Sequence, residues 1–239
     1  MNSTEQVIDI TNMEFSWRSG DHPTLAIQAM NVSRGERLFI KGASGSGKST
    51  LLSLLGGVVV QQQGSLHVLG QALNKMGSVG RDRFRADHVG FIFQMFNLLP
   101  YLSPIENVLL PCRFSSLRRG NVLKHGKNME AEARRILGHL DLTDNKQLNS
   151  PSIELSVGQQ QRVAAARALV GEPELVIADE PTSALDWDRR QAFLELLEHE
   201  CTNQGTTLVF VSHDASLESM FDRTIDLSKI NHATPGQKG

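Results

Sequence analysis

The sequence predicts an α/β fold built on a mostly parallel β-sheet, and three observations carry this prediction. Short apolar runs rich in β-branched and aromatic residues alternate along the chain with segments of helical periodicity. Each run is followed by polar residues, as expected for central strands of a sheet covered on both faces. The first of these strands runs into a glycine-rich stretch, and leucines at helical spacing follow at once.

The elements can be placed in chain order. Residues 6–34, with the alternating run VIDITNMEFSW, favour an N-terminal antiparallel β flap. The strands expected in the parallel sheet are residues 37–41, 88–93, 175–178 and 207–211. The expected helices are residues 48–55, 129–140, 157–170 and 189–201. The stretch 95–160 lacks a convincing strand and reads as mostly helical, which suggests a helical lobe inserted into an α/β core.

Composition limits the classes of function. A length of 239 residues allows one large domain, or one domain with an inserted lobe, and 40% apolar and 21% charged residues exclude general disorder. With 24 Lys and Arg against 26 Asp and Glu, the net charge of −2 predicts no general attraction to nucleic acid. The longest apolar run, residues 51–60, is too short for a bilayer crossing, which needs about 20 residues. The chain starts without the pattern of a secretory signal, and two cysteines without CxxC spacing suggest neither a disulfide framework nor a zinc site.

A basic cluster lies in the middle stretch, with no acidic residue among its members Arg113, Arg118, Arg119, Lys124 and Lys127. A solvated loop is the favoured interpretation, and contact with lipid head groups or a membrane partner is the alternative.

A phosphate-binding motif follows the strand at residues 37–41. Its glycines let the backbone wrap closely around phosphate groups, and the helix after it points free N–H groups at the anion. Lys48 is expected to reach the β- and γ-phosphates, and the Ser49 hydroxyl to ligate Mg²⁺. The strand before the motif and the helix after it argue against a merely flexible turn. The motif residues are Gly42, Ala43, Ser44, Gly45, Ser46, Gly47, Lys48 and Ser49, and they predict a P-loop NTPase core.

Two consecutive carboxylates end the apolar strand at residues 175–178. Open α/β sheets bind their ligands at the carboxyl ends of strands, which is where Asp179 and Glu180 stand. Asp179 can hold Mg²⁺ through water, and Glu180 can polarise the water that attacks the γ-phosphate. Capping of the next helix is the alternative, and it weakens once the phosphate loop upstream is considered.

A third motif begins a predicted helix. Ser156 and Gln159 fit the S-x-x-Q pattern of a capping box. A capped helix N-terminus that exposes Ser156 and the amide of Gly158 is also an anion site, which could receive the γ-phosphate of a nucleotide bound to a second molecule. Capping and binding are compatible.

Together these motifs resemble the ATP-binding-cassette (ABC) ATPases. The resemblance rests on LSVGQQQR, VIADEPTSALD and VFVSHD downstream of GASGSGKST, and it covers about residues 15–226 in the family's order. It implies a cassette that binds and hydrolyses ATP with Mg²⁺, and it includes Thr50 among the nucleotide-binding residues. The implied organisation is an ATP-binding core at 1–94 and 163–231, a helical signature subdomain at 95–162 and a flexible tail at 232–239.

Four further residues acquire roles from the resemblance. Gln94 matches the glutamine that senses Mg²⁺ and links ATP to the membrane subunit, and Asp186 matches an aspartate that crosses the dimer interface. His213 matches the switch histidine that contacts the γ-phosphate. Trp17 stands where the family places an aromatic residue on adenine, although it could instead belong to the core of the flap.

Two departures from the family pattern stand out. Val157 replaces a usual glycine, and we expect it to be helical, because valine would be strained at positive φ. The C-terminal strand ends in DLSKI instead of DGxI, and we expect this departure to affect only a surface turn.

A finer resemblance, around QMFNLLPYLSPIENVLLP and LLSLLGG, is to the lipoprotein-release and macrolide-export branch. It implies a head-to-tail homodimer of ATPase subunits that works with two integral membrane permease subunits, peripheral to the cytoplasmic face of the inner membrane. Residues 95–101 would form part of the groove for the permease coupling helix, and burial in the helical lobe is the competing interpretation. Other functions are a regulatory ATPase that signals to a membrane partner without transport, or a soluble ABC protein acting on ribosomes or DNA. A small-molecule kinase would need neither LSVGQ nor His213.

Overall fold

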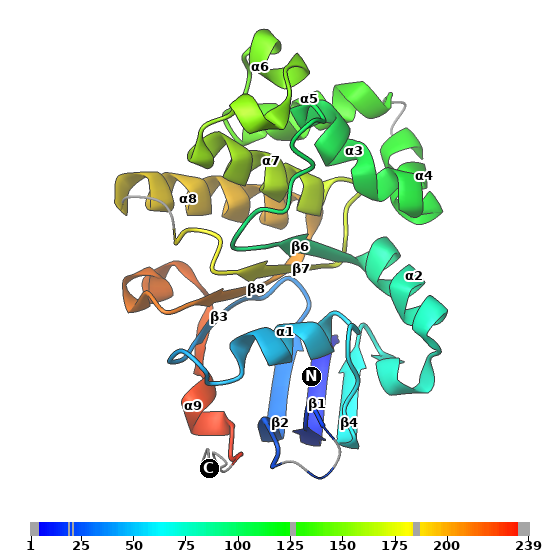
Figure 1. Ribbon diagram of the computed structural model, residues 1–239, viewed down its shortest axis with the longest axis vertical. Coiled ribbons are helices and arrows are strands. Elements are labelled where there is room, and N and C mark those ends of the chain that lie inside the picture. The colour runs from blue at the N-terminus through cyan, green and yellow to red at the C-terminus, as the bar shows by residue number, and fades with distance from the viewer. Residues whose placement is uncertain (1–4, 19, 21, 125–127, 184–186, 234–239) are drawn as a thin grey trace. The chain divides into compact units, whose positions relative to one another are not determined.

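The structure is a computed structural model that describes residues 5–18, 20, 22–124, 128–183 and 187–233. The chain forms two compact units, one of residues 1–85 and 209–239 and the other of residues 86–208. Figure 1 shows the helices and strands that make up the two units. The division at 94, 95, 162 and 163 expected from the sequence stays a prediction.

The first unit contains the antiparallel flap. Its sheet has the order β2-β1-β4-β5, with β1 (Gln6–Phe15), β2 (Leu25–Ser33), β4 (Gln63–Val68) and β5 (Gln71–Ala72). Along β1 the buried positions change parity, from Ile8 and Ile10 to Met13 and Phe15. The change occurs at Asn12, which has a φ of 47° and lies where the register with β4 shifts. A bulge adds one residue to a strand, so it moves the following side chains to the other face.

The first unit also holds a parallel pair of strands, β3 (Arg37–Lys41) and β9 (Arg223–Asp226). The chain returns to this unit along β8 (Thr207–Ser212), whose Phe210 stacks on Phe39 of β3 with ring centroids 6.1 Å apart. Phe221 packs against both rings, at 5.2 and 5.1 Å. The helical elements are α1 (Lys48–Leu55), η1 (Leu73–Lys75), η3 (Ala215–Met220) and α9 (Leu227–Ile230), while α2 (Ser78–His88) leads into the second unit.

The DLSKI segment corrects one expectation, because it is no surface turn. Residues Leu227–Ile230 form the helix α9, and Leu227 is fully buried. The Asp226 carboxylate caps α9 by accepting hydrogen bonds from the backbone N–H and the hydroxyl of Ser228, at 3.1 and 2.6 Å. An aspartate followed by an apolar residue therefore begins a short helix here.

The second unit combines parallel strands with helices. Strands β6 (Val89–Ile92) and β7 (Leu175–Asp179) pair in parallel, with Ile92 opposite Ala178. The expected parallel sheet, antiparallel flap and helical region are thus confirmed. The helices are α3 (Pro104–Phe114), α4 (Ser116–Lys124), α5 (Met129–His139), α6 (Asn145–Asn149), η2 (Ser152–Glu154), α7 (Val157–Leu169) and α8 (Trp187–Gln204).

Two contacts pack α7 closely in this unit. A Cβ added to Gly90 of β6 would lie 2.3 Å from the carbonyl oxygen of Ala168, so only glycine fits there. From α4, the buried Arg118 donates hydrogen bonds to the carbonyl oxygens of Ala168 and Val170, at 3.2 and 3.3 Å. Burial lowers the pKa of Arg118 to about 10, so it is charged at neutral pH, and its charge stabilises the helix C-terminus.

The basic cluster also departs from expectation, because residues 113–124 lie almost entirely in helices α3 and α4, not in a solvated loop. Arg118 and Val122, four residues apart, are buried and hold one face of α4 against its unit. Lys127 and residues 234–239 of the expected flexible tail lie outside the described residues. Within the described ranges, no helix combines the length and the apolar character that a membrane crossing requires.

Candidate nucleotide-binding and hydrolysis site

The residues expected in the site are divided between the two units, and each half can be built from its own contacts. The first unit carries the phosphate loop, Trp17 and His213, and the second carries Gln94, Ser156, Gly158, Gln159, Asp179 and Glu180. Asp186 lies outside the described residues.

The phosphate loop joins β3 to α1, as expected from the motif. Gly45 and Gly47 have φ values of 79° and 98°, a left-handed backbone that favours glycine. Gly47 is also sterically confined, since an added Cβ would lie 2.6 Å from Cδ2 of Leu25. The residue before α1 is Gly47, which has no side chain to cap the helix, and the N–H groups at the start of a helix are of the kind that binds an anion.

The Lys48 side chain folds over its own loop. Its Nζ donates hydrogen bonds to the carbonyl oxygens of Gly42 and Ala43, at 2.6 and 3.1 Å. The ammonium group is therefore already held beside the loop that the sequence assigns to phosphate. Ser49 is exposed at the start of α1, whereas Thr50 is buried.

Asn231 fastens the phosphate loop to the flap, and sequence analysis missed it. Its Nδ2 donates hydrogen bonds to the carbonyl oxygens of Ser46 and Thr24, at 3.2 and 3.1 Å. Its Oδ1 accepts one from the N–H of Ala26 at 2.9 Å. An asparagine 185 positions away from the loop carries no sequence signal of this contact.

Trp17 lies just beyond β1 in the same unit. Its ring meets that of Phe15 edge-on, with centroids 5.2 Å apart and planes at 85°, and the side chain stays 59% exposed. Phe15 pairs with Thr24 and Leu25, and those two residues contact the loop at Gly47. The exposed ring therefore stands at the end of the flap that approaches the phosphate loop, and its stacking on adenine stays a prediction.

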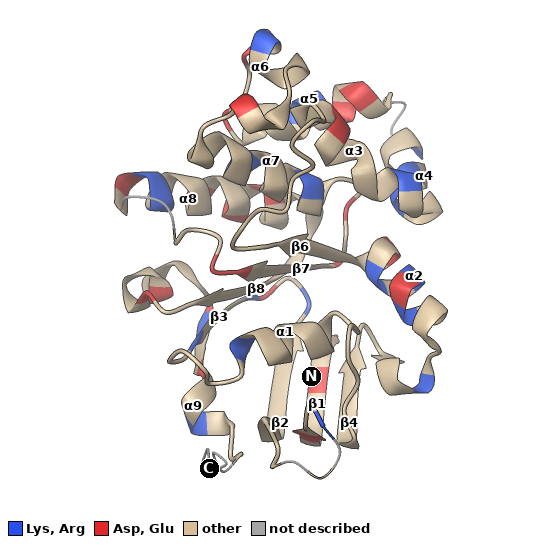
Figure 2. Cartoon of the chain, in the orientation of Figure 1, with Lys and Arg blue, Asp and Glu red and all other residues tan. Residues whose placement is uncertain are grey.

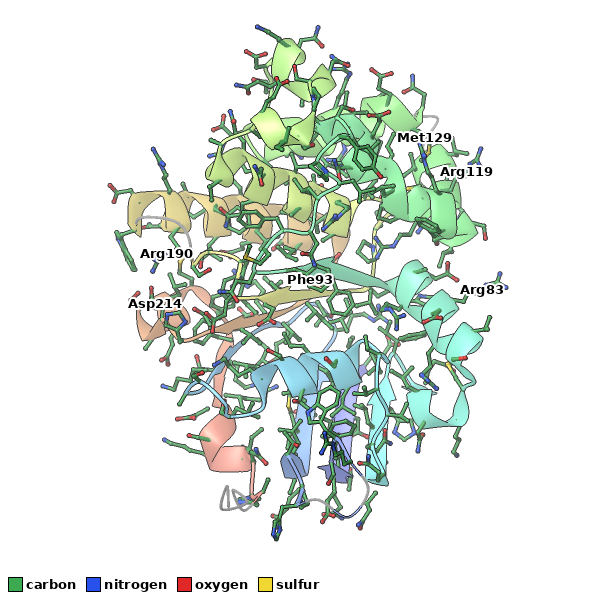
Figure 3. The ribbon with its side chains drawn as sticks, viewed as in Figure 1. Arg83, Phe93, Arg119, Met129, Arg190 and Asp214 are labelled. Carbon is green, nitrogen blue, oxygen red and sulfur yellow. The ribbon has the colours of Figure 1, made fainter. Side chains whose placement is uncertain are left out.

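His213 is the residue after β8, at the end of the strand, and it is exposed. The next residue, Asp214, is fixed by its backbone N–H, which donates a hydrogen bond to Ser212 Oγ at 3.1 Å. The Asp214 side chain, labelled in Figure 3, caps η3 through the backbone N–H of Ser216 at 3.1 Å. Both neighbours of His213 are thus held in place.

The second unit brings Gln94 and the two carboxylates to one sheet edge. Because β6 and β7 are parallel and pair Ile92 with Ala178, Gln94 and Glu180 each lie two residues beyond that pair. Phe93, labelled at the end of β6 in Figure 3, directly precedes Gln94. Glu180 has a φ of 44°, a left-handed conformation that is rare outside glycine and asparagine. The strand alternation therefore breaks at Glu180.

A second residue missed by sequence analysis, Arg167, holds the segment that follows Gln94. Phe96 and Asn97 both have left-handed backbones, with φ values of 58° and 50°. Arg167 of α7 donates one hydrogen bond to the carbonyl oxygen of each, both at 2.6 Å. Burial lowers the pKa of Arg167 below its ordinary value. The planar guanidinium group of Arg167 thus connects α7 to the segment that follows Gln94. The same helix begins with the signature motif.

The signature motif forms the capping box predicted for it. The N–H of Ser156 donates to Gln159 Oε1 at 2.9 Å, and the N–H of Gln159 donates to Ser156 Oγ at 3.4 Å. Val157 is the first residue of α7, so it is helical, as we expected. Gly158 follows it in the first turn, and Ser156 and Val157 are exposed.

Comparison with known proteins identifies the family of this chain. The family model described as ABC transporter matches residues 26–183. The chain belongs to the ABC transporter family. It is an ABC transporter ATPase with an ATP-binding cassette, and its relatives place it close to the LolD, MacB and YbbA branch.

Three curated relatives illustrate that placement. YbbA of Escherichia coli, an uncharacterized ABC transporter ATP-binding protein, is 38% identical over 93% of this chain and 95% of its own. The lipoprotein-releasing system ATP-binding protein LolD of Geobacter metallireducens is 37% identical, over 95% and 96%. The macrolide export ATP-binding/permease protein MacB of Rhodopirellula baltica is 36% identical over 92% of this chain, which spans 31% of that longer protein.

A solved structure of the ATP-binding cassette MJ0796, dimeric and bound to ADP and phosphate, has the same fold as this ABC transporter ATPase. The TM-score is 0.79 with 32% identity, and the match covers 92% of this chain and 95% of MJ0796.

Proposed function

We propose that this ATPase drives a membrane-bound ABC complex of the lipoprotein-release or macrolide-export type. The observation that carries the proposal is the similarity to LolD along nearly the full length of both chains. The similarity to the cassette part of MacB supports the same branch. The chemistry can be argued from the two halves of the site.

Nucleotide binding falls to the first unit in this proposal. The left-handed glycines and the uncapped start of α1 supply N–H groups for the phosphates, while Trp17 offers a ring for adenine. Lys48 would exchange the two carbonyl oxygens that it now contacts for phosphate oxygens. His213, after β8, would contact the γ-phosphate.

Hydrolysis falls to the edge formed by β6 and β7. Glu180 would accept a proton on its carboxylate from the attacking water, because it directly follows β7 at the carboxyl end of the strand. Ser49, Asp179 and Gln94 would hold Mg²⁺, and their oxygen donors are the type that this ion prefers. When bound, Mg²⁺ neutralises charge on the phosphate oxygens.

Completion of the site by a second copy is the next part of the proposal. The capped N-terminus of α7 exposes Ser156 and brings Gly158 and Gln159 into its first turn, where an anion is stabilised. In a head-to-tail dimer, this end of α7 would meet the γ-phosphate held by the other chain, and Asp186 would lie at the interface. The dimeric structure of the MJ0796 cassette supports a dimer.

The proposal also includes a contact surface for the membrane subunits. Met95, Tyr101 and Ile153 are 81%, 71% and 69% exposed. Backbone hydrogen bonds from Ile153 to Pro100, at 3.1 Å, and from Ser152 to Leu102, at 2.8 Å, bring these segments together. Phe96 is buried, so residues 95–101 divide between an exposed apolar surface and the core. We assign the exposed part to the coupling helix of a permease, at the cytoplasmic face of the inner membrane.

The test is co-purification of tagged Glu180→Gln protein from detergent-solubilised membranes in the presence of ATP. We expect two membrane subunits with few crossings and large extracytoplasmic domains. The matched control adds Lys48→Ala to the same chain, which removes nucleotide-dependent closure. A permease with many helices would disprove the assignment to this branch, and recovery of ribosomal or DNA-bound proteins alone would disprove the membrane function.

A further inference from the structure

The second unit presents an exposed surface in which arginine and lysine alternate with apolar side chains. It runs from the end of α3 along the outer side of α4. Phe114, Leu123 and Leu117 are 77%, 47% and 38% exposed, although they are residue types that normally lie inside a protein. We call this surface the basic apolar face, defined by Arg113, Phe114, Leu117, Arg119, Leu123 and Lys124.

The geometry of α4 explains why its members of the face turn outward, while Arg113 and Phe114 are the last two residues of α3. Arg118 and Val122 point into the unit, and residues about 100° away on either side of Arg118 turn outward. Leu117, Arg119, Leu123 and Lys124 are all exposed. Figure 3 shows Arg119 pointing away from the helices of its unit.

The helix that carries the face is firmly held. Besides the hydrogen bonds of Arg118 to Ala168 and Val170, Asn121 Nδ2 donates one to the carbonyl oxygen of Gly171 at 3.1 Å. Gly171 has a φ of 74°, and a Cβ there would lie 2.5 Å from Cβ of Arg118. The exposed apolar side chains therefore belong to a fixed surface, not to a frayed end.

The face has few acidic neighbours: Arg113 interacts electrostatically with Glu106 on the same helix, and Asp87 accepts a hydrogen bond from Ser115 Oγ, between α3 and α4, at 2.6 Å. From residue 107 to residue 129 the sequence has no Asp or Glu. Figure 2 shows blue and no red on α4. In the described part of the chain, no salt bridge involves Arg113, Arg119 or Lys124, and Lys124 donates only to Asn121 Oδ1, at 3.4 Å. By contrast, Arg134 of α5 pairs with Glu130 at 2.8 Å.

We propose that the basic apolar face binds the surface of a bilayer that contains anionic lipids. Phosphate groups of the lipid would meet the arginine and lysine side chains, while Phe114, Leu117 and Leu123 would enter the boundary between head groups and acyl chains. A surface that contacts only water would not need three exposed large apolar residues, one at the end of α3 and two on α4. The whole chain has a net charge of −2, so attraction to an anionic bilayer has to come from such a local surface.

The experiment measures binding of the purified full chain to vesicles by flotation. Vesicles of phosphatidylcholine with about 30% phosphatidylglycerol are compared with pure phosphatidylcholine. We expect binding to the anionic vesicles only, and weaker binding when salt rises from about 0.1 M to about 1 M, because screening shortens from about 10 Å to about 3 Å. Absence of binding to anionic vesicles at low salt overturns the proposal and would favour an acidic protein partner for the face.

Two matched triple variants test the location. Arg113→Gln/Arg119→Gln/Lys124→Gln should lower the partition coefficient on anionic vesicles at least tenfold. The control Lys75→Gln/Lys146→Gln/Lys229→Gln removes the same charge from exposed lysines elsewhere and should change it less than threefold. Equal losses in the two variants would overturn the proposal, as would no loss in the first.

A third variant tests the apolar contribution, and folding is checked for all of them. Phe114→Ser/Leu123→Ser should lower the partition coefficient several-fold at both salt concentrations, and unchanged binding would contradict insertion. ATP hydrolysis and the thermal unfolding midpoint of each variant are expected to equal those of the unmodified chain, so that a loss of binding cannot be ascribed to unfolding.

Discussion

At the scale of single residues, the position assigned to chemistry is one of seven described non-glycine residues with a positive φ. Glu180 has φ 44° at the end of β7, where a left-handed conformation disfavours most side chains by about 1–2 kcal/mol. Glu172 has φ 57° in the loop before the same strand, so it shares the conformation without the sheet edge. Glu172 therefore offers a control: it has the same backbone conformation as Glu180, but its carboxylate is not at the sheet edge.

Replacing Glu180 by glutamine should slow hydrolysis at least tenfold and leave ATP affinity within about twofold, because glutamine cannot accept the proton from water. Steady-state ATPase rates and nucleotide titration measure both quantities. Glu172→Gln is the control and should keep the normal rate. Near-normal turnover in Glu180→Gln would contradict its assignment as general base.

A single histidine also predicts how stability changes with pH. The hydrogen bond to Glu174, at 3.1 Å, is the main cause of a raised pKa for His88, and partial burial opposes it. The protonated form is therefore favoured in the folded chain. Both side chains are about one third exposed, so solvent screens the pair and the contribution is small.

Because the pKa is raised, this contribution is complete below the ordinary histidine pKa of 6.5 and is lost as pH rises through the folded value. Urea unfolding of the unmodified chain and of His88→Gln should thus differ in acidic buffer and converge in alkaline buffer. His199→Gln is the control. A difference that grew with pH would show the opposite sign and refute the assignment.

At the scale of elements, α7 is the helix on which several parts of the second unit meet. It carries the capping box at its start and Arg167 near its end, and β6 touches it at Ala168 through Gly90. A change at either end should therefore affect both stability and the placement of the segment after Gln94.

Arg167→Lys should lower the free energy of unfolding by about 1–3 kcal/mol, since one ammonium group replaces a fork that binds two carbonyl oxygens. The ATPase rate should also fall, because Gln94 lies two residues before Phe96. Chemical denaturation and ATPase assays measure the two effects. Arg134→Lys on α5, where the side chain is 33% exposed, is the control and should change stability by less than about 0.5 kcal/mol.

Gly90→Ala should destabilise the chain by about 1–3 kcal/mol, because its Cβ would lie 2.3 Å from a backbone oxygen that cannot move aside easily. Gly138→Ala in α5 should instead stabilise the helix by about 0.5–1 kcal/mol. Outside the neighbouring backbone of the helix, no atom lies within 4 Å of a Cβ added at Gly138. The midpoints of urea denaturation measure the change in stability of both variants. Similar midpoints for the two variants would show that β6 and α7 are less closely packed.

At the scale of the whole molecule, the question is how the two halves of the site are completed. In the proposed head-to-tail dimer, the phosphate loop of one chain faces Ser156 of the other. Two inactive variants can therefore complement each other, which a site completed within one chain would not allow.

Lys48→Ala should abolish ATP binding in its own loop, and Ser156→Arg should block the capped end of α7. Each variant alone should have negligible ATPase activity. An equal mixture should recover about a quarter of the normal rate, because about half of randomly paired dimers are mixed and each mixed dimer has one intact site. No recovery, despite formation of mixed dimers, would argue against the head-to-tail site.

Strand ends, motifs and the long apolar helices were predictable from the sequence, because their periodicity and glycine pattern are local. Strands 37–41 and 175–178 and helices 48–55 and 157–170 lie within one residue of the observed ones. Less was predictable where the local signal is weak. Helix α2 was missed because Phe84 is its one buried residue, and β5 because it has two residues.

The sequence by itself determined the family, the phosphate loop, the paired carboxylates and the capped start of α7, since each is encoded within a few neighbouring residues. Only the tertiary structure decided which distant groups hold them. Arg167 reaches the carbonyl oxygens of Phe96 and Asn97 across 70 positions, and Asn231 reaches Ser46 across 185. Both side chains bind backbone carbonyl oxygens, which every residue possesses. The side chains of the residues that they bind therefore do not predict these contacts.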